Sequence, residues 1–477
     1  MIVPSVPFLG FAAVAAVVFN LGAASWWCRL VLLAVNVVFL ASFSHDIAAF
    51  LPFIGFLALG FVAQRLTRGG SAPLLYLCLV VLTLVAFFWL KRYSFIPSAT
   101  YLAFPYVLVG LSYVFFRVLH LIIDSHQGAI DKPVGPLSYL NYVLNFTSLT
   151  SGPIQRYQDY HRMETERLPL DLVVAGGALE RIVVGYFKVA IVSMVLSMAQ
   201  HDAIDTLGAV QTEGDRIWTG VRIAAIYPVY LYFNFSGYTD VVIGVARFFR
   251  IVLPENFDRP FASENVITFW GRWHMTLSGW LKTYVYNPLM VAGMTRVTAP
   301  ALAPYLAVGA FFVTFFLVGL WHGQTSEFMF FGLLTGGGVA INKLYQVVMQ
   351  QRMGRKQYRA LAANPLYGAC CRGLNFTWFA FTLFWFWSGW TQIGIFAHTL
   401  GPATIVLVWL AILAGSIIVL AVMEALRDAI LKVKVGDDAV VRSRYVRTAW
   451  NTALVMVTVA VIVLLDSPAP DIVYKTF

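Results

Sequence analysis

Long apolar stretches, separated by short polar ones, recur along almost the whole chain. They lie at roughly 8–22, 29–43, 47–64, 72–90, 98–121, 173–198, 217–236, 301–320, 326–346, 374–392, 402–424 and 449–465. Most have the length that a helix needs to cross the hydrocarbon core of a membrane, and they are continuously apolar where the strands of a membrane barrel would alternate. The pattern predicts an all-α polytopic membrane protein with about 12 transmembrane or re-entrant helices.

The composition agrees with a chain that faces lipid. Hydrophobic residues make up 60% of the 477 residues and charged residues only 12%, about half the charged fraction of an ordinary soluble domain. These values exclude a soluble multidomain enzyme and an intrinsically disordered chain. We expect one integral-membrane domain over residues 1–477, with membrane lipids as a partner. The four cysteines show no metal-ligand spacing, so no metal site is expected.

The charged residues predict an orientation in the membrane. Basic residues lie at 64–68, 350–359 and 427–447, whereas 201–215 carries four acids and no Lys or Arg. Because cytoplasmic loops are enriched in Lys and Arg, this places both termini outside the cell, with Lys91 and Arg92 as a mild exception. The net charge of +10 reflects these loops. The basic residues are too scattered to form a nucleic-acid-binding face, so no nucleic acid is expected as a partner.

Two long segments interrupt the succession of apolar stretches, at 124–170 and 254–297. Irregular backbone at membrane depth is tolerated only where protein or a water-filled cavity covers it, so we expect a cavity on the cytoplasmic side. In the second segment Trp273, Leu277, Trp280 and Tyr284 follow a helical spacing. Trp and Tyr favour the boundary between lipid and water, which predicts a helix lying at the cytoplasmic membrane surface.

His322 lies at the end of one strongly apolar stretch and just before the next, within Leu-Trp-His-Gly-Gln at 320–324. An ionisable side chain at such a place is costly to bury and is a functional candidate for that reason. A histidine satisfied by a carbonyl at the end of a helix explains the same position. The residues by themselves leave both readings open.

Several motifs in the middle of the chain carry a family resemblance. They are Ser-Gly-Pro-Ile-Gln-Arg-Tyr at 151–157, Ser-Gly-Tyr-Thr-Asp at 236–240, Pro-Glu-Asn-Phe at 254–257, Phe-Trp-Gly-Arg-Trp-His-Met-Thr-Leu-Ser at 269–278, and Leu-Trp-His-Gly at 320–323. In this order they resemble the membrane-bound O-acyltransferase (MBOAT) family, in particular the bacterial branch with alginate O-acetyltransferases and D-alanyl transferases. The resemblance covers about 105–345, which we take as the catalytic core, and implies helices around a central tunnel.

The resemblance also implies roles for individual residues. His322 matches the signature histidine and would be the general base toward the acceptor hydroxyl, since imidazole titrates near neutral pH. His274 matches the second polar position, where it would orient the thioester carbonyl or donate to the oxyanion; an interfacial histidine facing headgroups is the alternative. Arg272 and Lys282 could meet the phosphates of a pantetheine donor. The further substrate-binding candidates are Asn234, Tyr238, Trp273, Ser278, Arg156 and Trp321.

The last residues, 466–477, form an expected extracellular tail whose ending resembles the Ile-Tyr-x-x-Phe terminus of bacterial MBOAT proteins. The resemblance implies an acyl relay in which Tyr474 accepts the acyl group at His322 and passes it outward. A disordered terminus is the alternative.

These features together favour an enzyme of a bacterial cell membrane. It would move a short acyl group, acetyl as the first choice, from a cytoplasmic thioester (acetyl-CoA or a carrier-bound pantetheine) to a hydroxyl of an external polysaccharide or cell-envelope glycan. No bound cofactor is expected, and the resemblance implies a secreted SGNH-type partner. The alternatives are D-alanyl transfer from a carrier protein to teichoic acid, a transporter or flippase without covalent chemistry, and a membrane scaffold.

Overall fold

The computed structural model describes residues 3–70, 72–297, 299–435, 438–439 and 443–465. The described chain divides into two compact units. Unit 1 holds the residues up to Tyr186 together with Gly237–Glu255, and unit 2 holds Phe187–Ser236 together with the residues from Asn256 onward. We describe each unit by itself.

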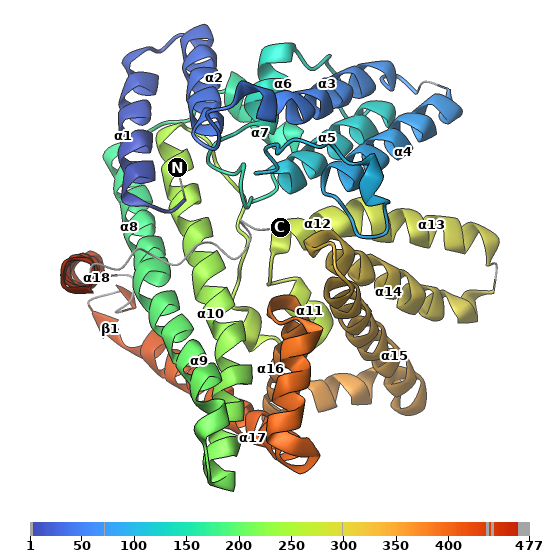
Figure 1. Ribbon diagram of the computed structural model, residues 1–477, viewed down its shortest axis with the longest axis vertical. Helices are drawn as coiled ribbons and strands as arrows, with labels where there is room; N and C mark the ends of the chain where they lie inside the picture. The colour runs from blue at the N-terminus through green and yellow to red at the C-terminus, as the bar shows by residue number, and fades with distance from the viewer. Residues whose placement is uncertain (1–2, 71, 298, 436–437, 440–442, 466–477) are drawn as a thin grey trace. The chain divides into compact units, whose positions relative to one another are not determined.

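Unit 1 is built from helices in the first two fifths of the chain (Figure 1). They are α1 (Val6–Leu21), α2 (Ser25–Ala41), α3 (Leu51–Leu66), α4 (Pro73–Leu90), α5 (Leu111–His126), α6 (Pro136–Val143), α7 (Tyr157–Thr165) and nearly all of α8 (Leu172–Phe187). The start of α1 shows how the sequence determines where a helix begins. Ser5 precedes it, and its hydroxyl accepts a hydrogen bond from the amide of Phe8 at 3.2 Å, which satisfies one of the free donors of the first turn.

Helix α5 is the centre of unit 1, and the long segment after it folds around a buried cation. The guanidinium of Arg117, 1% exposed, donates to the carbonyls of Tyr142, Val143 and Ser148 at 3.1, 2.9 and 2.9 Å. It also donates to the Ser148 hydroxyl at 2.6 Å. Buried charges persist in proteins when their donors are used in this way. The interruption expected after residue 124 is therefore ordered structure, anchored by one arginine.

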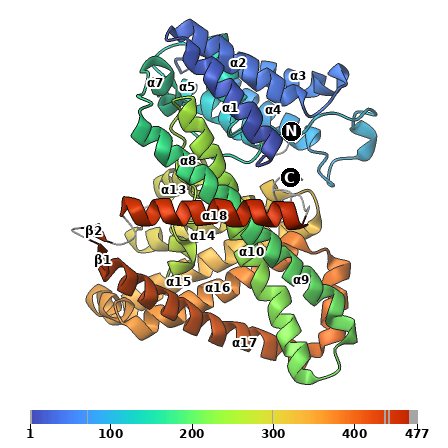
Figure 2. The same ribbon diagram turned by 90° about the vertical axis from the view of Figure 1, so that its left-hand side faces the viewer.

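Unit 2 holds the later helices, and α10 (Glu213–Phe248) passes from unit 2 into unit 1 at Ser236. The helices of unit 2 are α9 (Met194–Thr206), α11 (Val266–Trp270), α12 (Met275–Leu281), α13 (Asn287–Arg296), α14 (Ala303–His322), α15 (Ser326–Ala362), α16 (Pro365–Trp387), α17 (Trp390–Lys432) and α18 (Arg444–Leu465). A two-stranded antiparallel pair, β1 (Lys434–Val435) with β2 (Asp438–Ala439), lies between α17 and α18. In Figure 2, α18 crosses the view as a separate helix, and it packs beside the π-helical turn Lys188–Ser193.

Helices α14 and α15 lie side by side in backbone contact (Figure 1). A Cβ atom on Gly319 would overlap the Cα of Gly332, and a Cβ on Gly332 or on Gly336 would lie 2.6 Å from a carbonyl oxygen of α14. Small residues permit this close approach of two apolar helices, which gives van der Waals packing and excludes lipid. The contact fixes the last turn of α14, where His322 lies.

Two of the long helices are bent at a glycine in an extended, positive-φ conformation. Gly354 (φ 79°) interrupts α15, and Gly401 (φ 75°), followed by Pro402, interrupts α17. Glycine adopts this φ without the steric cost that a side chain would add, and proline cannot continue the preceding hydrogen-bond pattern. The second part of α17 therefore begins where the sequence predicts an apolar stretch, at 402.

The fold class expected from the sequence, an all-α polytopic membrane protein, is confirmed. Helices occupy each of the twelve apolar stretches, but the stretch at 98–121 is wrong at its start, because α5 begins only at Leu111. Among the described residues, five helical segments are long and apolar enough to cross a membrane: Ile47–Leu66, Pro73–Leu90, Leu172–Ala209, Pro300–His322 and Trp390–Lys432. Val6–Leu21 and Ser25–Ala41 are shorter apolar helices. The number of about 12 spans stays a prediction, as does the single-domain assignment.

Candidate active site

His274 is held at the start of α12 by a strained backbone and a buried amide. It adopts the left-handed conformation (φ 45°, ψ 52°) and is 1% exposed. The preceding residue Trp273 pairs with Phe257 in a β-bridge, and the amide of Met275 donates to the carbonyl of Asn256 at 2.9 Å. A non-glycine residue in this conformation costs on the order of 1 kcal/mol and persists only where its surroundings enforce it. Such residues occur often at functional sites.

The side chain of Asn256 determines the state of the His274 ring. Its Oδ1 accepts from the Thr276 amide at 3.2 Å and from the Thr276 hydroxyl at 2.9 Å, which identifies that atom as the oxygen. Oδ1 lies 3.1 Å from Nδ1 of His274, so Nδ1 must carry the proton. Burial lowers the pKa of His274 to about 3, and the ring is neutral at physiological pH. Nε2 then carries a lone pair and accepts, rather than donates, a hydrogen bond.

His322 is the last residue of α14 and is buried, with 3% of its surface exposed. The chain leaves the helix at Gly323, where a Cβ would overlap the ring of Phe328. Glycine at this position therefore lets Phe328 pack over the helix end. The imidazole lies among aromatic rings, with the centroid of Phe386 at 5.0 Å and that of Phe331 at 6.0 Å.

Trp321 connects the two histidines within unit 2. Its ring centroid lies 4.6 Å from that of His322 and 6.3 Å from that of His274. Phe235 packs against His274 from α10, at 5.0 Å. The structure thus brings both predicted histidines into one buried, aromatic environment. A buried imidazole at this place can take a proton from a hydroxyl and return it to a leaving thiolate.

The remaining unit 2 candidates differ in exposure. Asn234 is buried in α10, while Arg272 and Ser278 are half-buried and Lys282 is exposed at the start of a π-helical turn. The Ser278 hydroxyl is directed to the carbonyl of Trp273 at 3.5 Å. Arg272 and Lys282 therefore keep charged groups accessible near the loop that carries His274.

The helical face expected for the aromatic segment is wrong at its first member. Trp273 lies before α12, in the bridge to Phe257, and its ring packs at 4.9 Å on Phe379 and at 5.7 Å on Phe269. The spacing places a residue on a helical face only if the helix includes it, and here the helix begins at Met275. The Trp273 ring belongs to the aromatic core of unit 2.

Two candidates, Tyr238 and Arg156, lie in unit 1. The Tyr238 hydroxyl is 2.8 Å from that of Thr150 and accepts from the Ser151 amide at 3.2 Å. Arg156 is exposed and precedes the first residue of α7. Tyr238 thus holds the turn near 150, and the role of both residues in substrate binding stays a prediction. The predicted relay residue, Tyr474, lies outside the described residues.

Asn256 is the site residue that sequence reasoning missed. It lies 18 positions before His274 and is fully buried, and only the folded loop shows that its side chain bonds the ring. Its motif, Pro-Glu-Asn-Phe at 254–257, was available as a signal of the family.

Among the described residues, no group of three or more His, Cys, Asp or Glu side chains is arranged to hold a metal ion.

Comparison with known proteins identifies the family. The model of the MBOAT, membrane-bound O-acyltransferase family, matches residues 56–386, which include both histidines. Teichoic acid D-alanyltransferase of Bacillus subtilis (strain 168) is 28% identical over 319 residues, covering 63% of this chain and 77% of that protein. Probable alginate O-acetylase AlgI of Pseudomonas fluorescens is 32% identical over 238 residues, covering 49% of this chain and 44% of that protein. The match therefore spans less than half of the AlgI relative.

The family model covers well over half of the chain, and the histidines that carried the resemblance lie together in unit 2. The expected enzyme class, an acyltransferase, is confirmed by the family and by the relatives. The chain belongs to the membrane-bound O-acyltransferase family.

Proposed function

We propose that this protein transfers a short acyl group, acetyl as the first choice, from a cytoplasmic thioester to a hydroxyl of an extracellular or periplasmic glycan. The observation that carries the proposal is the pair of buried imidazoles, His274 and His322, which contact the same Trp321 ring. The names of the relatives, an alginate O-acetylase and a teichoic acid D-alanyltransferase, support a cell-envelope polysaccharide as acceptor. A bacterial cell membrane is the corresponding location.

His322 is the general base in the proposed reaction. Its imidazole takes the proton of the acceptor hydroxyl as the oxygen attacks the thioester carbonyl. The tetrahedral intermediate then collapses, the carbon–sulfur bond breaks, and the imidazolium returns the proton to the leaving thiolate. No cofactor is consumed, because the thioester supplies both the acyl group and the driving force.

His274 positions the donor in this scheme. Its neutral ring with the proton on Nδ1 fits the acceptance of a hydrogen bond at Nε2, for example from an amide N–H of the pantetheine arm. This orients the thioester carbonyl and does not require His274 to donate to the oxyanion. Arg272 and Lys282 would meet the phosphates of the same donor, and Asn234, Ser278 and Trp321 would line its path.

The tail supplies the outward step of the proposal. Tyr474 would accept the acyl group at His322 as an aryl ester, which stays activated for a second transfer to the glycan through a secreted SGNH-type partner. Tyr474→Phe would then abolish transfer to the external acceptor together with the thiol release that attack by this phenol causes. Unchanged transfer by Tyr474→Phe, with loss in His322→Ala, would rule out the relay.

D-alanyl transfer to teichoic acid is the second candidate function. It is favoured by the coverage of the Bacillus subtilis relative, 77% of that protein. A carrier protein and its ligase encoded beside this chain would support D-alanine as the acyl group. A periplasmic esterase-like protein encoded beside this chain would instead support acetyl as the acyl group.

The first experiment measures thiol release from acetyl-CoA by purified protein in nanodiscs. We expect slow release by wild type and none by His322→Ala, with His398→Ala, an exposed histidine of α17, as the matched control that keeps activity. Release that is equal in wild type and His322→Ala would show that His322 is not the base. A folded wild type without release from acetyl-CoA would favour a carrier-protein donor or a missing partner.

A further inference from the structure

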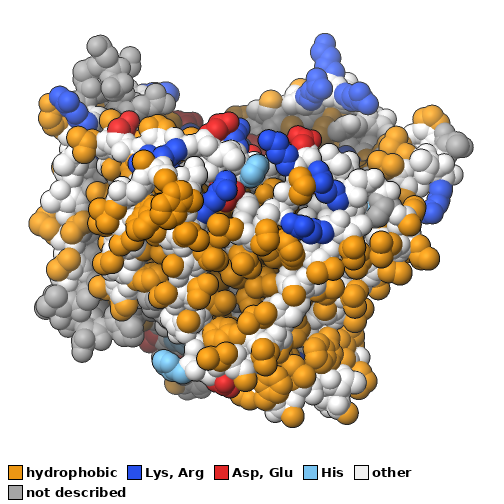
Figure 3. All heavy atoms as spheres, turned by 90° about the horizontal axis from the view of Figure 1, so that it is seen from above, with side chains coloured by type: hydrophobic (Ala, Val, Ile, Leu, Met, Phe, Trp, Pro, Cys, Tyr) orange, Lys and Arg blue, Asp and Glu red, His pale blue; other side chains and the backbone are white. Residues whose placement is uncertain are grey.

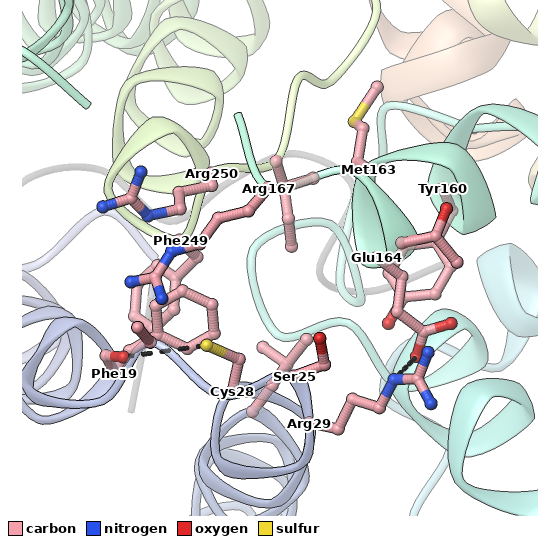
Figure 4. Close-up of a pocket in the computed structure, with 14 residues that line it drawn as sticks. Phe19, Ser25, Cys28, Arg29, Tyr160, Met163, Glu164, Arg167, Phe249 and Arg250 are labelled. Carbon is pink, nitrogen blue, oxygen red and sulfur yellow. Dashed lines mark hydrogen bonds and ion pairs between the residues drawn. The ribbon is translucent and has the colours of Figure 1, made fainter. Parts of the chain in front are cut away.

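Unit 1 contains a pocket that the proposed reaction does not use. It lies where α1 ends and α2 begins, and it is closed by α7 and by the residues that follow α10 (Figure 4). The lining combines two phenylalanines, Phe19 and Phe249, with the charged side chains of Arg29, Arg167, Arg250 and Glu164. Three guanidinium groups thus line this pocket, at the ends of apolar helices. Their like charges need compensation, which a bound anion could supply.

Glu164 compensates only one of the three arginines. Its Oε1 lies 3.3 Å from Nε of Arg29, and its Oε2 accepts from the Ser138 hydroxyl at 2.6 Å. The Glu164 side chain is 4% exposed, so this carboxylate is committed to the side of the pocket formed by α2 and α7. Figure 4 shows the pair on the opposite side of the pocket from Arg167 and Arg250.

The other two arginines have neutral partners in the part of the chain that the structure describes. Nη1 of Arg167 donates to the carbonyl of Gly22 at 3.1 Å. Arg250 donates from Nε to Oδ1 of Asn20 at 3.1 Å and from Nη1 to the carbonyl of Leu168. Burial, and next the positive charge of Arg167, lower the pKa of Arg250. Two like charges held together in a partly apolar pocket are stabilised by an anion that binds both.

The surroundings of the pocket favour a lipid as the source of that anion. Leu21 and Leu30 are 76% and 49% exposed and Trp26 is 63% exposed, which gives an apolar rim on α1 and α2. The orientation predicted from the basic loops places the turn between these helices on the cytoplasmic side. Figure 3 shows one face of the molecule, on which Lys and Arg side chains lie along one side of a broad hydrophobic surface.

We propose that this pocket binds the phosphate of an anionic phospholipid from the cytoplasmic leaflet, with Arg167 and Arg250 on the phosphate and the acyl chains along the exposed apolar rim. Arginine suits this task because its planar fork bonds two phosphate oxygens at once. A soluble phosphate compound offers the same anion but has no chains to cover Leu21 and Leu30. The site lies in unit 1 and is independent of the proposed acyl transfer.

The test uses native mass spectrometry of the full-length protein in a neutral detergent. The probes are phosphatidylglycerol, phosphatidylcholine and, separately, coenzyme A. We expect one phosphatidylglycerol to bind at least tenfold more tightly than phosphatidylcholine, and Arg167→Gln to remove this preference. Arg162→Gln is the matched control, because Arg162 lies five residues before Arg167, at the end of α7, and has a 64% exposed side chain outside the pocket.

A second variant and a second readout protect the test against misfolding. Arg167→Lys keeps the charge and should retain most of the preference. Cys28 lines the pocket, and in a variant with the other three cysteines replaced by alanine, phosphatidylglycerol should slow its reaction with N-ethylmaleimide. Binding of coenzyme A that depends on Arg167, without a preference among lipids, would overturn the lipid source. An unchanged phosphatidylglycerol preference in folded Arg167→Gln would overturn the site itself.

Discussion

Two buried histidines, one in each unit, show how different the demands on the same side chain are. In unit 1, Nε2 of His120 accepts from the amide of Tyr157 at 3.0 Å and Nδ1 lies 3.4 Å from the carboxylate of Asp124. Nε2 thus joins α5 to the first residue of α7, while Nδ1 pairs with a carboxylate of α5 itself. In unit 2, His322 lies among the rings of Trp321, Phe331 and Phe386. The comparison teaches that burial alone does not separate a structural histidine from a candidate catalytic one, and that the groups around the ring must be considered as well.

The largest expected difference is in activity. His322→Gln should lower acyl transfer at least 100-fold, since a general base contributes about that much or more, with a melting temperature close to that of wild type. His120→Gln should leave acyl transfer per folded molecule unchanged but lower the melting temperature. It leaves buried groups without hydrogen-bond partners, at a cost of about 1–3 kcal/mol in the free energy of unfolding. Transfer assays and thermal melts in detergent measure both variants. A stable, inactive His120→Gln protein would break the comparison.

The second prediction concerns the buried cation beside His120. Arg117→Met should destabilise the protein by about 3 kcal/mol or more, because three carbonyls lose a charged donor. Arg162→Met, on a largely exposed side chain, is the control and should change stability by less than about 0.5 kcal/mol. The readout is the melting temperature. Equal melting temperatures for the two variants would contradict a structural role for Arg117 and the carbonyls that it binds.

The third prediction tests how unit 2 positions its histidine. A Cβ on Gly319 would overlap Gly332, whereas a Cβ on Gly309 of the same helix meets nothing within 4 Å. Gly319→Ala should cost about 1–3 kcal/mol through overpacking and lower transfer about tenfold by moving His322. Gly309→Ala should be neutral or stabilising by up to about 1 kcal/mol. Full activity of Gly319→Ala would show that the backbone contact does not position the imidazole.

The smallest effect is a pH dependence from His274. Its pKa is about 3 in the folded protein and about 6.5 when unfolded, so the unfolded state binds more protons between these values. The contribution to stability is therefore complete above about pH 6.5 and is lost as pH falls toward 3. Between pH 6.5 and 5.5 wild type should lose about 1 kcal/mol more than His274→Gln. Parallel curves for the two proteins would argue against a neutral, buried ring.

The sequence predicts elements better than the contacts between them. The stretch at 301–320 matches α14 (Ala303–His322) because a membrane imposes both the length and the apolar character of a spanning helix. The prediction that Trp273 lies on a helical face was wrong, because residue spacing cannot show that Trp273 forms a β-bridge with Phe257 and that the helix begins only at Met275. Asn256 was missed because its role depends on the path of the chain over 18 residues. The family motifs identified the two histidines in the sequence, whereas the tautomer of His274 follows only from the hydrogen bonds of Asn256 in the folded protein.

The contact of α14 with α15 through Gly319 and Gly332 has a consequence for the evolution of substrate range. The position of His322 depends on two polypeptide backbones rather than on the volume of the rings around it. Phe331 and Phe386 can therefore change in size without moving His322. In the proposed function, smaller side chains there would leave room for longer acyl groups beside this imidazole. Acyl-chain selection in such an architecture can diversify quickly, while the proton-transfer step stays the same.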